Sequence, residues 1–130
     1  MKILVIDDEQ LIRWSLEKHF SNKGCKVLTA ESGEDGIELF KEETPDIIFL
    51  DNKLPGIQGL DVIDKIKSLH DDAVIVFMTA YGSIETAVNA MKFGASDYIN
   101  KPFTLKEVDM AFDEVSKKIK LTKLVYERTE

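Results

Sequence analysis

The stretch KILVIDDE, residues 2–9, decides how the rest of the chain is interpreted. Lys2–Ile6 form a short and mostly apolar run of the kind found in strands that are buried on both faces of a parallel sheet. Asp7, Asp8 and Glu9 follow directly, at the carboxyl end of that strand. Ligand sites of open α/β sheets lie beyond the carboxyl ends of the strands. The stretch therefore predicts a buried strand with a polar site next to it.

Four further runs of the same kind follow along the chain, and longer segments of helical period separate them. They are Lys26–Ala30, Asp46–Leu50, Ala73–Met78 and Asp97–Asn100. This alternation predicts an α/β fold with a parallel sheet covered by helices. With right-handed crossovers, we expect a three-layer, doubly wound, five-stranded flavodoxin-like sheet of order 2-1-3-4-5 with five helices. The second and fifth runs are more polar, which suits edge strands.

Helix signals lie between the runs. Two i, i+4 rows mark a first helix that ends near Gly24, namely Leu11, Ser15, His19 and Ile12, Leu16, Phe20. Ser32 is expected to cap a second helix that has Glu34 and Asp35 in its first turn, and Ser83 to cap a fourth helix. A capping box from Thr104 to Glu107 begins the fifth.

Composition limits the kinds of function. The chain has 130 residues, enough for one domain, and a net charge of −7. An acidic chain lacks the clustered cations that nucleic acid or an anionic membrane requires, so we expect this segment to bind neither. Cys25 is the only cysteine, and the longest apolar run, Ala73–Met78, is far shorter than the roughly 20 residues of a membrane span. No secretory signal is present, and we expect a cytoplasmic protein.

Polar residues follow the other buried runs as well. Asp51 follows the third run, Thr79 and Ala80 the fourth, and Asn100, Lys101 and Pro102 the fifth. If the sheet is as predicted, three carboxylates and an ammonium group share one cleft. Two carboxylates about 4 Å apart repel by roughly 4 kcal/mol at an effective dielectric constant of about 20, so the cluster needs a cation, and Mg²⁺ suits such oxygen ligands.

With a cation bound, a phosphoryl group can approach the cleft. An aspartate can then act as the nucleophile, and the Thr79 hydroxyl, the Ala80 amide and Lys101 can each contact a phosphoryl oxygen. Alone, each residue has an ordinary structural explanation, since Asp7 and Asp8 suit a helix N-terminus and Asp51 suits a turn. Their coincidence at the strand ends favours the site.

These motifs resemble the receiver domains of two-component response regulators. The resemblance covers residues 1–120 and rests on Asp7-Asp8, on Asp51 with Leu54-Pro55-Gly56, on Thr79-Ala80 and on Lys101-Pro102-Phe103. It implies that Asp51 accepts a phosphoryl group from a histidine kinase's phosphohistidine. The protein would then not be a conventional enzyme, but would catalyse its own aspartyl phosphorylation and dephosphorylation.

The resemblance also implies a role for each site residue. Asp8 and Asp51 would bind Mg²⁺ directly, Asp7 largely through water, and Lys53 through its backbone carbonyl. Lys101 would pair with the phosphate across a cis Lys101–Pro102 bond, and Thr79 with Tyr98 would form the switch pair. Phosphorylation would change the surface of the fourth helix, fifth strand and fifth helix.

A narrower likeness lies in the segment Tyr81-Gly82-Ser83-Ile84-Glu85-Thr86-Ala87, in Ala90-Met91-Lys92, in Gly94-Ala95 and in Arg13-Trp14. It is similar to receivers of the nitrogen-regulatory type, which precede an ATPase and a DNA-binding domain in sigma-54-dependent transcriptional activators. We therefore expect residues 121–130 to begin a helical linker to an output domain that this chain lacks.

The fifth helix carries a row of residues, apolar apart from Thr122, at alternating spacings of three and four. They are Leu105, Val108, Phe112, Val115, Ile119, Thr122 and Tyr126. This heptad pattern predicts either a core helix that frays after Ile119 or the start of a coiled-coil linker that makes a homodimer.

Two other functions compete with the phosphoacceptor. One is a receiver-like interaction or dimerisation module that phosphorylation does not regulate. The other is a flavodoxin-like cofactor carrier, but that needs a phosphate-binding loop where Asp7-Asp8-Glu9 stands.

Overall fold

A five-stranded parallel sheet lies at the centre of the protein, in a computed structural model that describes residues 1–80 and 83–129, the last four by their backbone alone. Its strands are β1 (Lys2–Ile6), β2 (Lys26–Ala30), β3 (Ile47–Asp51), β4 (Val74–Ala80) and β5 (Asp97–Lys101), in the order β2-β1-β3-β4-β5. All four neighbouring pairs are parallel. The predicted doubly wound, flavodoxin-like α/β fold is confirmed, and so is the placement of the second and fifth strands at the edges.

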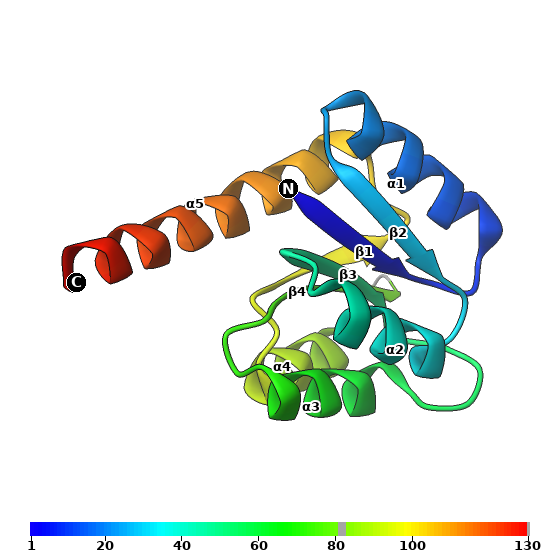
Figure 1. Cartoon of the computed structure of the whole chain (residues 1–130). Helices are drawn as coiled ribbons and strands as arrows, with labels where there is room; N and C mark the ends of the chain where they lie inside the picture. Colours follow the sequence, from blue (N-terminus) through cyan, green and yellow to red (C-terminus); the bar gives the residue numbers. More distant parts are fainter. Residues whose placement is uncertain (81–82, 130) are drawn as a thin grey trace.

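Five helices of the described residues cover the two faces of the sheet. They are α1 (Gln10–Asn22), α2 (Gly33–Glu43), α3 (Gly59–Leu69), α4 (Ile84–Phe93) and α5 (Leu105–Thr129). α1 and α5 lie on one face, and α2, α3 and α4 lie on the other (Figure 1). Each face has its own hydrophobic core, one around Phe77 and Ile63 and one around Phe20 and Phe49.

Three strand ends differ from the predicted boundaries. β3 ends on Asp51, β4 continues through Thr79 and Ala80, and β5 continues to Lys101. Backbone pairing of Thr79 with Asn100 and of Ala80 with Lys101 extends both strands beyond the apolar run. Hydrophobicity marks where a strand is buried, whereas backbone pairing sets where it ends.

The two rows that predict α1 differ in burial, although the helix itself is confirmed. Leu16 and Phe20 are fully buried against the sheet, but Leu11 is 69% exposed. The helix begins at Gln10, so Leu11 lies in its first turn, next to the solvent-facing Trp14. Only the row through Leu16 and Phe20 forms the buried stripe.

Two of the three predicted caps are confirmed. The Ser32 hydroxyl accepts a hydrogen bond from the Asp35 N–H, and Thr104 and Glu107 exchange the hydrogen bonds of a capping box. Ser83 occupies the predicted N-cap position of α4, but its side chain makes no capping hydrogen bond among the described residues. Tyr81 and Gly82, part of the narrower likeness, lie outside the described residues.

The core takes up most of the heptad pattern in α5. Val108 and Val115 are fully buried, and Phe112 and Ile119 pack against the same cluster. The helix then continues away from the sheet as far as Thr129 (Figure 1), so the expectation that it frays after Ile119 is wrong.

Different residues are exposed on the projecting part of α5. Leu121, Leu124 and Val125 are 52% to 62% exposed, whereas the predicted seam ran through Thr122. The Thr122 hydroxyl donates a hydrogen bond to the Lys118 carbonyl of its own helix, and the Tyr126 side chain lies outside the described residues.

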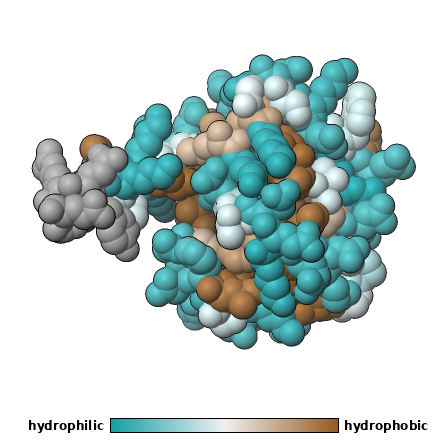
Figure 2. Space-filling view, in the orientation of Figure 1, coloured by the Kyte–Doolittle hydropathy of each residue, from teal (hydrophilic) through white to brown (hydrophobic). Residues whose placement is uncertain are grey.

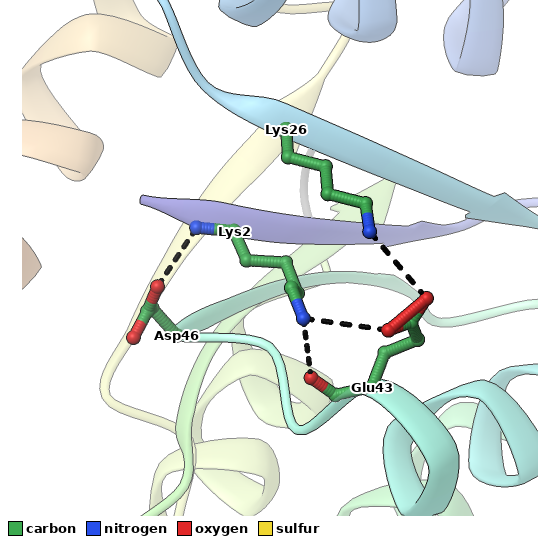
Figure 3. A network of polar contacts seen from close by, with 4 residues as sticks. All are labelled: Lys2, Lys26, Glu43 and Asp46. Carbon is green, nitrogen blue, oxygen red and sulfur yellow. Dashed lines mark hydrogen bonds and ion pairs between the residues drawn. The ribbon is translucent and has the colours of Figure 1, made fainter.

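A network of polar contacts joins β1, β2, the end of α2 and Asp46, the residue before β3, at the amino end of the strands (Figure 3). The Lys2 ammonium lies 3.4 Å from the Glu43 carboxylate and donates to the Glu43 carbonyl, while Lys26 lies 3.6 Å from the same carboxylate. The Lys2 N–H donates to Asp46. These contacts fix β1 and β2 against the end of α2 and leave the opposite end of the sheet for the functional site.

The surface is mostly hydrophilic on the face drawn in Figure 2, with hydrophobic side chains in several small patches, one of them at the base of the projecting part of α5. A hollow there is lined by Phe40, Pro45, Val74 and Ile119 among others. Among the described residues, no helix combines the length and the hydrophobicity needed to span a bilayer.

Candidate functional site

The carboxyl ends of four strands bring the predicted site residues to one edge of the sheet. Asp51, Ala80 and Lys101 are the last residues of β3, β4 and β5, and Asp7 directly follows β1. They surround a hollow lined by Asp8, Glu9, Ile12, Asp51, Asn52, Lys53, Ala80, Lys101 and Pro102.

The three aspartates form an acidic cluster. Asp7, Asp8 and Asp51 each present a carboxylate oxygen, and these oxygens lie within 4.8 Å of one another. Asp7 is fully buried and Asp51 is 6% exposed, while Asp8 faces solvent. Two charges at that separation repel by about 3 kcal/mol at an effective dielectric constant of about 20, so the cluster favours a cation.

Lys101 supplies one positive charge to this cluster. Its ammonium nitrogen lies 2.7 Å from Asp7 Oδ2, 3.2 Å from Asp51 Oδ1 and 3.8 Å from Glu9 Oε1. Burial favours the neutral amine, but pairing with Asp7 and Asp51 outweighs burial and raises the pKa of Lys101. One ammonium against three aspartates leaves a formal charge of −2.

Burial raises the pKa of both buried carboxylates, Asp51 and Asp7. Burial first, and then the negative charge of Asp7, raise the pKa of Asp51 to about 6. Burial also raises the pKa of Asp7, although Lys101 and a hydrogen bond from the Glu9 N–H oppose that rise. The ionised forms of these carboxylates are therefore destabilised in the folded protein, and such perturbed pKa values are typical of functional sites.

Backbone contacts fix the acidic turn after β1. The Asp7 N–H donates to the Ala30 carbonyl at 3.1 Å, and Asp7 Oδ1 accepts from the Glu9 N–H at 2.9 Å. The Arg13 guanidinium donates to the Asp7 carbonyl at 2.9 Å. The sequence predictions gave Arg13 no such contact, because only the fold brings the side chain back to this turn.

Close packing fixes the backbone after β3. The Asn52 N–H donates to the Met78 carbonyl at 2.9 Å, and the Gly59 N–H donates to the Asn52 carbonyl at 3.1 Å. A Cβ atom on Gly59 would lie 2.7 Å from the Asp51 carbonyl oxygen, so a glycine is required where α3 begins against Asp51.

Thr79 adds a buried hydroxyl to the site. Its side chain is fully buried, and Oγ1 has no hydrogen-bond partner among the described residues. A buried polar group without a partner costs about 1–3 kcal/mol. Such a hydroxyl suits a ligand oxygen that arrives from outside.

The structure does not bring every predicted residue into the cluster. Lys53 is exposed at the mouth of the hollow. Tyr98 is 44% exposed and lies beside α4, in a hollow that it shares with Ile84, Val88 and Met91. The Lys101–Pro102 bond is cis, as the resemblance implied.

The residues present fit a hard divalent cation. Three carboxylates offer oxygen ligands within reach of one another, and an exposed Asp8 leaves one side open to water. Mg²⁺ prefers such sites, with few protein ligands and room for water.

A doubly wound sheet with an acidic cluster, a half-buried lysine and a buried threonine at its carboxyl edge defines a class of α/β domains with an acidic site at the strand ends. Residues 3–113 match the response regulator receiver domain, and the chain belongs to that family.

Two curated regulators illustrate the relationship. The chain is 36% identical over 105 residues to the DNA-binding transcriptional regulator NtrC of Escherichia coli, an alignment that covers 81% of this chain and 22% of NtrC. It is 34% identical to the regulatory protein AtoC of the same organism, over 84% of this chain and 24% of AtoC. The chain thus spans about a quarter of the length of these relatives.

Solved structures share the fold. NtrX from Brucella abortus superimposes with a TM-score of 0.90 at 33% identity, over 95% of this chain and 29% of NtrX. A response regulator receiver domain protein from Clostridium thermocellum superimposes with a TM-score of 0.87 at 33% identity, over 93% of this chain and 98% of the other.

Proposed function

We propose that this chain is the phosphoacceptor receiver of a two-component system, in which Asp51 accepts a phosphoryl group from the phosphohistidine of a sensor histidine kinase. The observation that carries the proposal is the convergence of three aspartates, Lys101 and the buried Thr79 hydroxyl, which has no partner among the described residues, at one edge of the sheet. Such a site neutralises phosphoryl oxygens and presents a carboxylate nucleophile.

Each residue has a role in the transfer. A carboxylate oxygen of Asp51 attacks phosphorus, the bond from phosphorus to the imidazole nitrogen breaks, and the imidazole leaves with that electron pair. Lys101 already lies 3.2 Å from Asp51 and pairs with a phosphoryl oxygen. The Thr79 hydroxyl and the Ala80 N–H donate to the other oxygens.

Mg²⁺ is the proposed cofactor. Asp8 and Asp51 would bind it directly, Asp7 largely through water, and Lys53 through its backbone carbonyl. The ion supplies the positive charge that lets an anionic phosphoryl group enter an acidic site.

We propose that the full-length protein is cytoplasmic and controls transcription. In this proposal, Thr79 moves toward the phosphate, Tyr98 turns inward, and the surface of α4, β5 and α5 changes. Apolar side chains are already exposed on α4, above all Ile84 at 75%, and an output domain could bury them. Similarity to NtrC supports ATPase and DNA-binding domains further along the full-length chain.

Residues 1–120 form the proposed receiver domain, and 121–130 begin the linker. Exposed Leu121 and Leu124 on the projecting helix support a homodimer through this segment. Sedimentation of the chain, with and without phosphorylation, should reveal a dimer that Leu121→Glu disrupts. A monomer in both states at high concentration would refute the dimer.

Labelling by a small acyl phosphate tests the phosphoacceptor. With Mg²⁺, intact mass should show a single phosphoryl group on the protein, and Asp51→Asn should carry none. Asp64→Asn, which removes the same charge from the exposed side of α3, should be labelled like the parent protein. Undiminished labelling of Asp51→Asn would refute the assignment. An unlabelled parent protein would favour the phosphorylation-independent interaction module.

A further inference from the structure

A loop from Asn52 to Gln58 joins β3 to α3 and leads away from the acidic cluster. It carries Lys53 at the mouth of the site, and it is anchored in the core by Leu54, which is 5% exposed. Its other end, around Gly56 and Ile57, lies against the start of α2. α2 supplies none of the three aspartates, yet it contacts the loop that follows one of them.

Glu34, in the first turn of α2, makes the polar contact with this loop. Its Oε1 atom accepts a hydrogen bond from the Ile57 N–H at 2.8 Å. Gly56 has a φ of +74°, and a Cβ atom there would lie 2.8 and 2.9 Å from the two Glu34 carboxylate oxygens. The carboxylate therefore occupies the space beside Gly56 and satisfies the next backbone N–H.

Close packing holds α2 itself in place. A Cβ atom on Gly33 would lie 2.4 Å from Cγ2 of Ile57, and one on Gly36 would lie 2.4 Å from Cδ1 of Ile6. The helix is thus seated directly on the loop at its start and on β1 one turn later. Because close packing fixes α2, the Glu34 carboxylate can hold the loop in place.

We propose that Glu34 is a positioning residue for the phosphoacceptor site. Through Gly56 and Ile57 it holds the loop in the conformation that keeps Lys53 at the hollow that Asp51 also lines. This inference rests on the proposed function, because that function makes the Lys53 carbonyl a ligand of Mg²⁺. Glu34 itself touches neither the ion nor the phosphoryl group.

Binding of Mg²⁺ alone, measured by calorimetry on the whole chain, tests the role of Glu34. Glu34→Ala should weaken binding about fivefold, the factor that corresponds to one net hydrogen bond of about 1 kcal/mol. Hydrogen exchange at the Ile57 N–H should become faster in the same variant. Glu34→Gln keeps an acceptor oxygen and should restore both values. Asp35→Ala removes the same charge from the same turn and should bind Mg²⁺ within twofold of the parent protein.

Glu34→Asp is a second variant. It keeps the negative charge, and aspartate is also favourable in the first turn of a helix. It withdraws the oxygens by one methylene from Ile57, so it should behave like Glu34→Ala. Unchanged Mg²⁺ affinity in both variants would overturn the proposal, even if the Ile57 N–H exchanged faster. A parent protein that binds Mg²⁺ without being labelled at Asp51 would refute the proposed function, while the Mg²⁺ series would still decide the role of Glu34.

Discussion

Replacing Asp51 by asparagine is expected to stabilise the folded protein at pH 7.5 when no divalent cation is bound. Burial and the charge of Asp7 raise the pKa of Asp51 from 3.8 to about 6, which corresponds to about 3 kcal/mol against the ionised form in the folded state. Asparagine mimics the protonated carboxyl group and avoids that cost. Lys101 keeps a partner, because its ammonium still lies 2.7 Å from Asp7.

The same reasoning fixes the pH dependence. Because the pKa of Asp51 is higher in the folded state, the folded protein binds more protons than the unfolded chain at pH values between 3.8 and about 6. The contribution of this group to stability is therefore largest below pH 3.8 and falls as the pH rises through 6. The stability difference between variant and parent should grow from near zero at about pH 4 to about 3 kcal/mol above pH 7.

Urea unfolding in a chelator, followed by circular dichroism at several pH values, measures this difference. Asp64→Asn, which removes a charge from an exposed position on α3, should change the free energy of unfolding by less than about 0.5 kcal/mol. Added Mg²⁺ should stabilise the parent protein more than Asp51→Asn and so narrow the gap. A variant no more stable than the parent at pH 7.5, or a gap that shrinks as the pH rises, would refute the reasoning.

Three further substitutions test other parts of the structure by the same measurement. Thr79→Val removes a buried hydroxyl without a described partner, so it should raise stability by about 1 kcal/mol while slowing labelling. Burial would raise the pKa of Asp109, but hydrogen bonds from His19 and Lys23 outweigh it and lower that pKa. Asp109→Asn should therefore cost about 1 kcal/mol near neutral pH, and that cost should vanish as the pH falls below 3.8. Gly36→Ala should cost about 2 kcal/mol, because its methyl group would lie 2.4 Å from a β1 side chain.

The sheet could be predicted because each strand carries its own signal. Apolar runs such as Lys2–Ile6 stand out against the helical segments, and parallel topology then fixes which strand ends meet. The same logic predicts from the sequence that Asp7 and Asp51 lie at one edge of the sheet. The ends of the strands are harder to predict from the sequence, since the pairing of Thr79 with Asn100 depends on the backbone of the neighbouring strand.

Helix faces and loop contacts could be predicted less well. The heptad in α5 fits a coiled coil and a core helix equally, and only the fold shows that the sheet covers Val108 and Val115. Glu34 carries the ordinary pattern of an acidic residue in a first helical turn. Its contact with Ile57 joins positions 23 residues apart and has no local signature in the sequence.

The acidic cluster lowers the stability of the fold and creates affinity for a cation by the same interactions. Burial first, and then the negative charge of Asp7, raise the cost of ionising Asp51, and a divalent cation would cancel the formal charge of −2 around Asp7, Asp8, Asp51 and Lys101. If binding relieved the whole of about 3 kcal/mol, the affinity for the cation would rise about 150-fold over that of an uncrowded cluster. Substitutions that stabilise the fold by removing one of these three carboxylates should therefore also weaken cation binding.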